Sequence, residues 1–207
     1  MRGQNSTPTD TSPCHHEDMT LLEHDVLIID QVTGFFTNDF AIHDAQGIPV
    51  GIITTGGSAL SRSFLGSRQL TVVESDGRPL LTVDDVPNLG RDTFALLGPD
   101  GQRFAEVVKQ FTLFSKHLTV QLADEKLELR GSFWEREFTV AGSQGQAAQV
   151  SRSWPGIGAA LLGRERYALG FAGELPHHLR AATVGAVLAL DLIRAKESSA
   201  ASAGSSS

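Results

Sequence analysis

Residues 179–193 constrain the fold more than any other part of this 207-residue chain. Their apolar side chains would lie around every side of a helix instead of forming one stripe, so such a helix must be buried on all faces. Only ten uncharged residues separate Arg180 from Asp191, and as a helix they rise about 15 Å, roughly half of a bilayer's hydrocarbon core. The segment therefore predicts a helix enclosed by the rest of the protein and not a membrane span.

Before this helix, a hairpin unit recurs five times. Each copy has two short runs of β-branched or aromatic residues joined by turn residues such as Asp76-Gly77 and Asp100-Gly101. Asp-Gly between alternating runs is the strongest short-range signal of a β-hairpin. The copies begin at residues 40, 70, 94, 118 and 138, and further strand-like runs at 26–29 and 167–171 bring the count close to twelve strands.

A dozen short antiparallel strands must hide their edges, and closure into a barrel hides them completely. The interior of a barrel this wide is too large for its own side chains to fill, so the C-terminal helix would supply the filling. We therefore predict a mainly β domain over residues 21–196, a closed antiparallel barrel of approximately twelve strands enclosing a C-terminal hydrophobic helix. Residues 1–20 and 197–207 have the composition of disordered tails.

Two residues of the predicted helix stand out. Gly185 is about 1 kcal/mol less favourable than alanine in a helix interior, so we expect another part of the chain to approach closely there. Asp191 has two interpretations, either a buried carboxylate that gates a ligand or a residue near the helix C-terminus that reaches a basic partner at the barrel rim. The second is favoured because an unpaired buried charge is very costly.

Composition narrows the function classes. The net charge of -7 argues against a nucleic-acid partner. A single cysteine, Cys14, excludes an internal disulfide and fits a reducing cytosol, and the N-terminal residues lack the apolar region of a secretory signal. Cys14 begins a Cys-His-His-Glu-Asp tract of metal-binding composition, but chance clustering in a tail is the favoured interpretation because nothing nearby fixes ligand geometry. No nucleophile motif is present, so we expect no catalytic residues and no enzymatic activity.

The closing segments carry a family resemblance. A strand followed by Arg152-Ser-Trp154-Pro-Gly-Ile157 precedes a strand with alternating aromatics and a small-residue helix that ends in Asp191. Together with the opening segments 27–31 and 39–47, this order resembles the phospholipid scramblase and LURP-one-related family, which has the tubby-like C-terminal fold, over residues 21–196. The resemblance implies a cytoplasmic domain, peripheral to the inner face of the membrane, that binds lipid surfaces or scrambles phospholipids.

The calcium site of the scramblase relatives, an acidic run before the final helix, is not carried over. At the corresponding place only Glu165 and Glu174 are acidic, among Arg164, Arg166 and two histidines. Calcium needs six to eight oxygen ligands, several of them carboxylates, so we expect no metal site and no cofactor. We expect the two glutamates to pair with the arginines instead. The cysteine cluster that takes palmitate in those relatives is also absent.

Basic residues supply the candidates for anionic lipid headgroups. Arg152, Arg164 and Arg166 flank a connection that holds Trp154, Leu161 and Leu162, and Lys109 with Lys116 forms a second, weaker group. Each basic residue near an anionic surface adds about 1 kcal/mol of binding. The alternative, a solvated loop on the barrel rim, is favoured for the first group. The alternative function is a soluble scaffold that binds a protein or a small ligand at the barrel rim.

Overall fold

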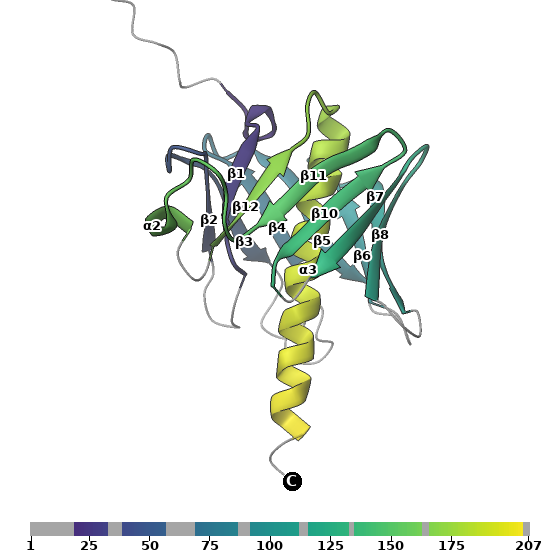
Figure 1. Ribbon diagram of the computed structural model, residues 1–207. Helices are drawn as coiled ribbons and strands as arrows, with labels where there is room; N and C mark the ends of the chain where they lie inside the picture. Colours follow the sequence, from purple (N-terminus) through teal and green to yellow (C-terminus); the bar gives the residue numbers. More distant parts are fainter. Residues whose placement is uncertain are drawn as a thin grey trace, which may run out of the picture.

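The computed structural model describes residues 19–32, 39–56, 69–86, 92–111, 116–132, 135–162 and 166–204. The described strands form one closed antiparallel barrel, in which each strand pairs with its neighbours in sequence and β1 pairs with β12 (Figure 1). In chain order the elements are η1 (Leu21–Glu23), β1 (Val26–Asp30), β2 (Asp39–His43), β3 (Pro49–Gly56), β4 (Gln69–Glu74), β5 (Pro79–Val86), β6 (Thr93–Leu97), β7 (Arg103–Phe111), β8 (Lys116–Leu122), β9 (Lys126–Ser132), β10 (Glu137–Gly142), β11 (Gly145–Ser151), α2 (Ala159–Leu162), β12 (Arg166–Phe171) and α3 (His177–Gly204).

The predicted barrel is confirmed, and it contains each of the five predicted hairpins. The five repeated units are β2–β3, β4–β5, β6–β7, β8–β9 and β10–β11, all antiparallel. The ring closes where β1 meets β12, in a register that runs from Val26 opposite Gly170 to Asp30 opposite Arg166. The two ends of the barrel sequence therefore form its closing seam.

Three of the hairpin turns share one hydrogen-bonding pattern. In each, an aspartate Oδ1 accepts a hydrogen bond of 2.9–3.0 Å from the backbone N–H two residues later. A glycine with a φ of 75–87° completes the turn, in the left-handed region that glycine adopts without strain. The three pairs are Asp44 and Gly47, Asp76 and Gly77, and Asp100 and Gly101.

Helix α3 passes through the barrel and continues beyond it (Figure 1). Every residue from 179 to 193 is buried, as the apolar side chains on all sides of this segment predict. Pro176 precedes the first turn, and its carbonyl accepts hydrogen bonds from the N–H groups of Leu179 and Arg180. None of the described helices is long and apolar enough to cross a membrane.

Helix α3 continues beyond residue 196, the predicted end of the domain, to Gly204. The extension has a physical cause in its own sequence. Glu197 makes an ion pair with Lys109 of β7, and the following residues are mostly alanine and serine, of which alanine is the best helix former. The tail predicted over residues 1–20 lies mostly outside the described residues.

Gly185 lies in the enclosed part of α3, against β6 of the barrel wall. A Cβ atom added there would lie 2.8 Å from both Cδ atoms of Leu96, which is fully buried. The predicted close approach at Gly185 is therefore confirmed. It accounts for a glycine in a helix interior, where an alanine would otherwise be about 1 kcal/mol more favourable.

We expect Gly185→Ala to lower the free energy of unfolding by about 1–3 kcal/mol, because the added methyl group overpacks against Leu96. Gly185→Leu should be more damaging for the same reason. In a Leu96→Ala background, Gly185→Ala should be neutral or stabilising, since the new methyl group then enters vacated space. Urea unfolding followed by circular dichroism measures all four combinations.

Gly158→Ala is the control for this series, because no described atom lies within 4 Å of a Cβ added at that position. It should change the free energy of unfolding little. Equal effects of Gly185→Ala in the two Leu96 backgrounds would contradict the packing argument.

Candidate functional site

The barrel has two rims that differ in what α3 does there. At the upper rim, α3 begins at His177, beside the 172–176 connection and the turns 123–125 and 143–144. At the lower rim, α3 leaves the barrel towards its C-terminal end (Figure 1). The predicted headgroup residues Arg152 and Arg166 belong to the lower rim, where β11 ends and β12 begins.

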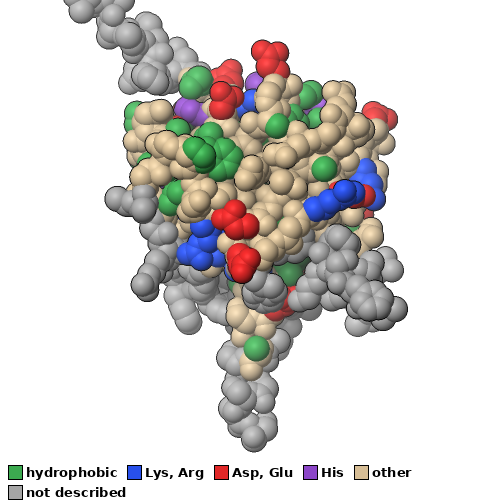
Figure 2. Space-filling model, in the orientation of Figure 1, with side chains coloured by type: hydrophobic (Ala, Val, Ile, Leu, Met, Phe, Trp, Pro, Cys, Tyr) green, Lys and Arg blue, Asp and Glu red, His purple; other side chains and the backbone are tan. Residues whose placement is uncertain are grey.

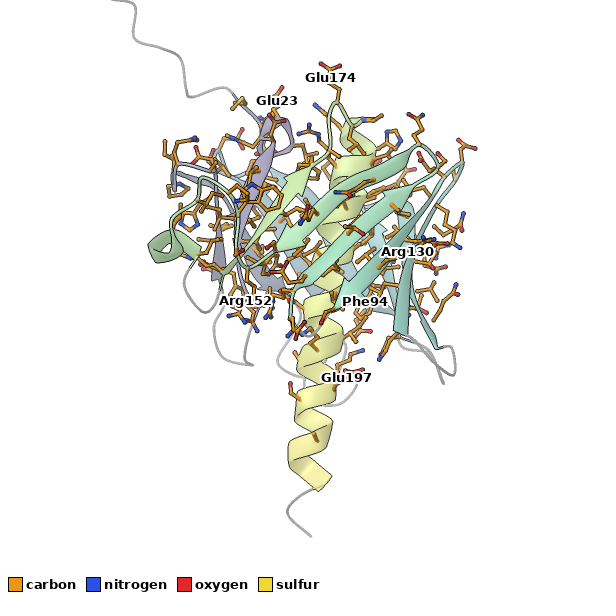
Figure 3. All side chains as sticks on the ribbon, in the orientation of Figure 1. Glu23, Phe94, Arg130, Arg152, Glu174 and Glu197 are labelled. Atoms are coloured by element: carbon orange, nitrogen blue, oxygen red, sulfur yellow. The ribbon has the colours of Figure 1, made fainter. Side chains whose placement is uncertain are left out.

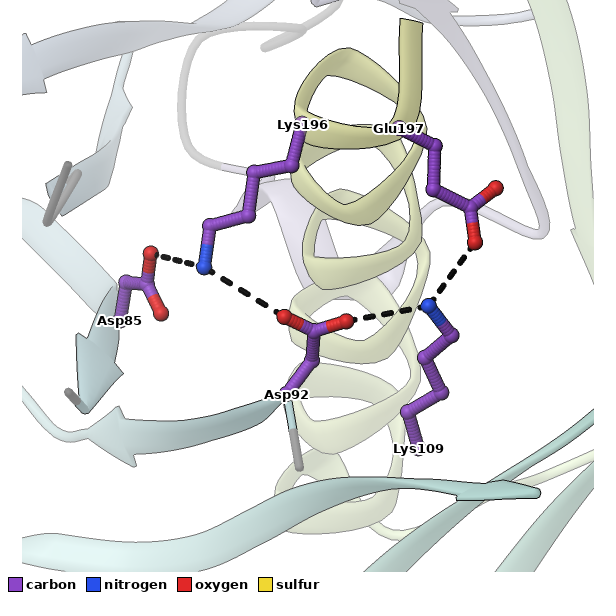
Figure 4. A network of polar contacts seen from close by, with 5 residues as sticks. All are labelled: Asp85, Asp92, Lys109, Lys196 and Glu197. Carbon is purple, nitrogen blue, oxygen red and sulfur yellow. Dashed lines mark hydrogen bonds and ion pairs between the residues drawn. The ribbon is translucent and has the colours of Figure 1, made fainter. Parts of the chain in front are cut away.

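Lys109 lies in a partly buried ion-pair network at the lower rim (Figure 4). Its Nζ is 3.0 Å from Asp92 Oδ2 and 2.8 Å from Glu197 Oε1, and the side chain is 5% exposed. Lys196 Nζ contacts Asp85 Oδ2 at 2.6 Å and Asp92 Oδ1 at 3.6 Å, so the network joins β5 and β7 to α3.

These contacts argue against the predicted headgroup role of Lys109, because its charge is already paired inside this network. Burial alone would lower the pKa of Lys109, but hydrogen bonds to Glu197 and Asp92 raise it above its ordinary value. The ammonium group therefore stays charged and holds two carboxylates to the barrel, which leaves it no access to a lipid surface.

Arg166 also makes contacts that hold parts of the barrel together. Its Nε lies 2.6 Å from Asp30 Oδ1, and its Nη1 donates a hydrogen bond of 3.2 Å to the carbonyl of Leu161. Asp30 Oδ2 accepts a bond from the N–H of Ala41, so the pair ties β12 to β1 and β2. The predicted pairing of Arg166 with Glu174 is wrong, since Glu174 lies at the opposite rim (Figure 3).

The apolar side chains between the candidate arginines cover the outside of the barrel. Leu162 is buried with Ile28 and Ala168, and Trp154 and Leu161 pack against this outer cluster. Trp154 lies so close to β12 that a Cβ added at Gly170 would be 2.2 Å from its ring. Because these side chains pack against the barrel, less apolar surface is left for the predicted interfacial patch.

Among the headgroup candidates, Arg152 keeps an exposed side chain, and it lies at the lower rim (Figure 3). Its backbone N–H donates to Glu137 Oε1 at 2.9 Å. Arg164 and the side chain of Lys116 lie outside the described residues, so their predicted roles stay predictions. On the face shown in Figure 2, basic and acidic side chains are interspersed instead of forming one basic patch.

Asp191 is enclosed near the lower end of the barrel. Its Oδ2 accepts hydrogen bonds from Tyr167 Oη at 3.1 Å and the N–H of Val32 at 3.3 Å, and Arg136 Nη2 approaches its Oδ1 at 3.4 Å. The predicted basic partner is therefore confirmed. The predicted position near the helix C-terminus is wrong, because α3 continues to Gly204.

Burial sets the protonation chemistry of this cluster. It raises the pKa of Asp191, although the guanidinium groups of Arg136 and Arg194 oppose the shift. Burial and the neighbouring Asp191 raise the pKa of Tyr167 well above its ordinary value, so its hydroxyl remains a hydrogen-bond donor. The guanidinium of Arg136 also lies 5.6 Å from the centre of the Tyr167 ring. The cluster anchors α3 to the barrel wall.

At the upper rim, a groove of about 360 Å³ opens beside the first turn of α3. Two hairpin turns form one wall and the 172–176 connection forms the other. The lining residues that matter for chemistry are Glu125, Leu127, Gln146, Glu174, His178 and Leu179. The floor is apolar, because Leu127 and Leu179 are buried, whereas Glu174 and His178 are exposed at the mouth.

The groove walls are held by hydrogen bonds. The N–H of Ala172 donates to the carbonyl of Ala147 at 2.9 Å, which joins the connection to β11. Arg180 is buried, and its guanidinium lies 4.7 Å from the centre of the Phe171 ring. That guanidinium donates bonds of 3.0–3.1 Å to three backbone carbonyls, those of Leu22, His24 and Gly173. The groove is therefore preformed.

The groove is electronegative. Glu125 Oε1 accepts hydrogen bonds from Ser143 Oγ at 2.8 Å and from its N–H at 3.4 Å, which orients the carboxylate without neutralising it. No lysine or arginine lines the groove, and no ion pair joins Glu125 or Glu174 to a cation within the described ranges. From the sequence alone, Glu125 does not stand out, and Glu174 is predicted to pair with an arginine.

The family model of the LURP-one-related proteins matches residues 25–191, most of the chain. This chain belongs to the LURP-one-related family. The X-ray structure of a protein from Arabidopsis thaliana is similar to this LURP-one-related barrel, with a TM-score of 0.52 and 16% sequence identity over 78% of this chain and 89% of that one. At that identity the likeness shows the fold alone, and it agrees with the tubby-like fold. No curated protein matches the chain significantly.

We expect Asp191→Ala to destabilise the protein by about 3–5 kcal/mol, because it leaves the guanidinium of Arg136 buried without a counter-charge. The double variant Asp191→Leu with Arg136→Met should recover much of that loss, since it removes both charges together. Urea unfolding of Asp191→Leu, of Arg136→Met and of the double variant gives the coupling energy. Independent, additive effects would show that the pair is not the anchor described above.

Proposed function

We propose that this LURP-one-related domain is a non-enzymatic binding protein whose ligand site is the upper-rim groove. The observation that carries the proposal is the preformed space of about 360 Å³, which falls in the size range of small-molecule sites, about 300–1,000 Å³. The barrel interior is filled by α3 and the inward side chains, so a ligand must bind at an end or on the outside.

The composition of the groove supports binding without catalysis. Its lining holds no serine, threonine, cysteine or lysine that could act as a nucleophile. Its titratable groups are Glu125, Glu174 and His178, and no hydrogen bond joins two of them among the described residues. An apolar floor with a few polar groups at the mouth is the usual arrangement of a binding pocket. The proposal corresponds to the scaffold alternative, with a small ligand at the barrel rim.

Backbone-amide NMR tests the groove on the full chain, with a cocktail of small amines, carboxylic acids, alcohols and aromatic compounds as probes. We expect chemical-shift changes to cluster at groove residues such as Gln146, Glu174 and Leu179. Ala172→Trp should abolish them, because Ala172 is exposed, lines the groove and can hold a larger side chain that occupies it. Shifts that gather at the lower rim, or that survive in Ala172→Trp, would refute the assignment.

Lipid-surface binding, which the family resemblance implies, is a second proposal, and the observation in its favour is the exposed Arg152 at the lower rim. It would place the domain in the cytoplasm, against the anionic inner face of the membrane. The burial of Lys109 and the packing role of Trp154 limit the surface available for it. Phospholipid scrambling through the barrel has less support still, because the apolar filling offers a headgroup no polar path.

Flotation with phosphatidylserine vesicles tests the second proposal. If the lower rim binds headgroups, Arg152→Gln should reduce flotation by about fivefold, the equivalent of about 1 kcal/mol for one basic residue, and added salt should reduce it further. Arg103→Gln is the matched control, since Arg103 is an exposed arginine at the start of β7, at the upper rim. No flotation at low salt, or equal loss in the two variants, would exclude this surface.

We further propose that the domain works without calcium. Glu165 lies outside the described residues, and Glu125 is the one other acidic residue that lines the groove with Glu174. Two carboxylates are too few for calcium, which takes six to eight oxygen ligands. The melting temperature should therefore be the same in millimolar calcium and in chelator. A calcium-dependent rise that Glu174→Gln abolishes would contradict this, because binding to the folded state alone raises its stability.

A further inference from the structure

We propose that the ligand of the upper-rim groove is a small organic cation, with an ammonium or guanidinium group carried on an aliphatic chain. This inference rests on the proposed function, because it names the ligand class of the same groove. It is carried by the joint placement of Glu125 and Glu174 on a partly apolar cavity.

The first step is the charge. Glu125 is half-buried, and its Oε1 is occupied by Ser143, so the carboxylate is held in one orientation while Oε2 has no hydrogen-bond partner among the described residues. Glu174 adds a second negative charge from the opposite wall. A cleft lined by one sign of charge with low-dielectric walls concentrates counter-ions, and here the counter-ion is a cation.

The second step is the competing effect of the helix. The first turn of α3 lines the groove, and a helix N-terminus carries about half a positive charge, which favours anions. Two carboxylates carry about four times that charge with the opposite sign. An anion would therefore meet net repulsion in the groove, whereas a cation meets net attraction.

The third step is the shape and the floor. A space of about 360 Å³ holds a molecule of several heavy atoms and is much larger than a bare ion needs. Leu127, Leu179 and the half-buried Leu175 give it apolar surface on which methylene groups can pack. No group of three or more potential metal ligands occurs in the described ranges. An amine with an aliphatic stem fits both the floor and the mouth.

Three four-carbon probes separate the charge classes, namely the dication putrescine, neutral butanediol and the dianion succinate. Titrated into the full-length protein at low salt, putrescine should shift the amide resonances of the groove, and the other two should not. Saturable shifts from succinate or butanediol without putrescine binding would overturn the cation assignment while the groove itself remained a binding site.

Isosteric charge removal then locates the contact. Glu125→Gln and Glu174→Gln should each raise the Kd for putrescine by about fivefold, equivalent to about 1 kcal/mol. Asp124→Asn is the matched control, an exposed carboxylate of the same turn that does not line the groove. It should change the Kd by less than about twofold, the effect of distant screened charge.

The outcomes distinguish this inference from the proposed function. Equal weakening by all three substitutions would show that putrescine only follows the negative net charge of the protein, which overturns the inference. If the fragment cocktail maps to the groove but putrescine does not bind, the groove is a site for another chemistry. If neither the cocktail nor putrescine maps there, both proposals fail.

Discussion

The packing of α3 against the inside of the barrel is the contact on which the rest of this structure depends. A ring of twelve strands encloses more space than its own side chains fill, and an unfilled interior would lose the dispersion contacts that stabilise a core. Helix α3 fills this space, and it is narrow enough to fit because its side chains are those of alanine, glycine and mid-sized aliphatic residues. At Gly185 the fit is tight enough that even a methyl group meets Leu96.

Apolar packing alone would let a smooth rod slide or rotate, and polar contacts at three levels fix its position. Arg180 ties the first turn to η1 and the 172–176 connection, Asp191 contacts Arg136 and Tyr167, and Glu197 meets Lys109 at the lower rim. A one-residue rotation of α3 would break all three sets together. The two rims, and with them the groove, are positioned by this register.

Much of the fold could be predicted because its signals are local. Asp76-Gly77 and Asp100-Gly101 specify their turns within four residues, and the apolar run of α3 predicts its own enclosure. The site could not be predicted in the same way, because its contacts join distant parts of the chain. No residue near Lys109 in sequence indicates that Glu197 is its partner. Glu125 and Glu174 line the same groove only because alternate connections of a closed up-and-down barrel share a rim. The rule that alternate connections share a rim could have indicated from the sequence that these turns lie side by side.

The closing seam between β1 and β12 has a consequence for biosynthesis. The chain is made from its N-terminus, yet Val26 pairs with Gly170 and the filling helix begins only at His177. The first strand therefore keeps an open edge until nearly the whole domain has left the ribosome, and pairing of such sequence-distant segments makes folding slow. Exposed edges of incomplete sheets are templates for aggregation. This topology therefore leaves the growing chain open to aggregation for an interval, which ends when β12 pairs with β1 and α3 fills the barrel.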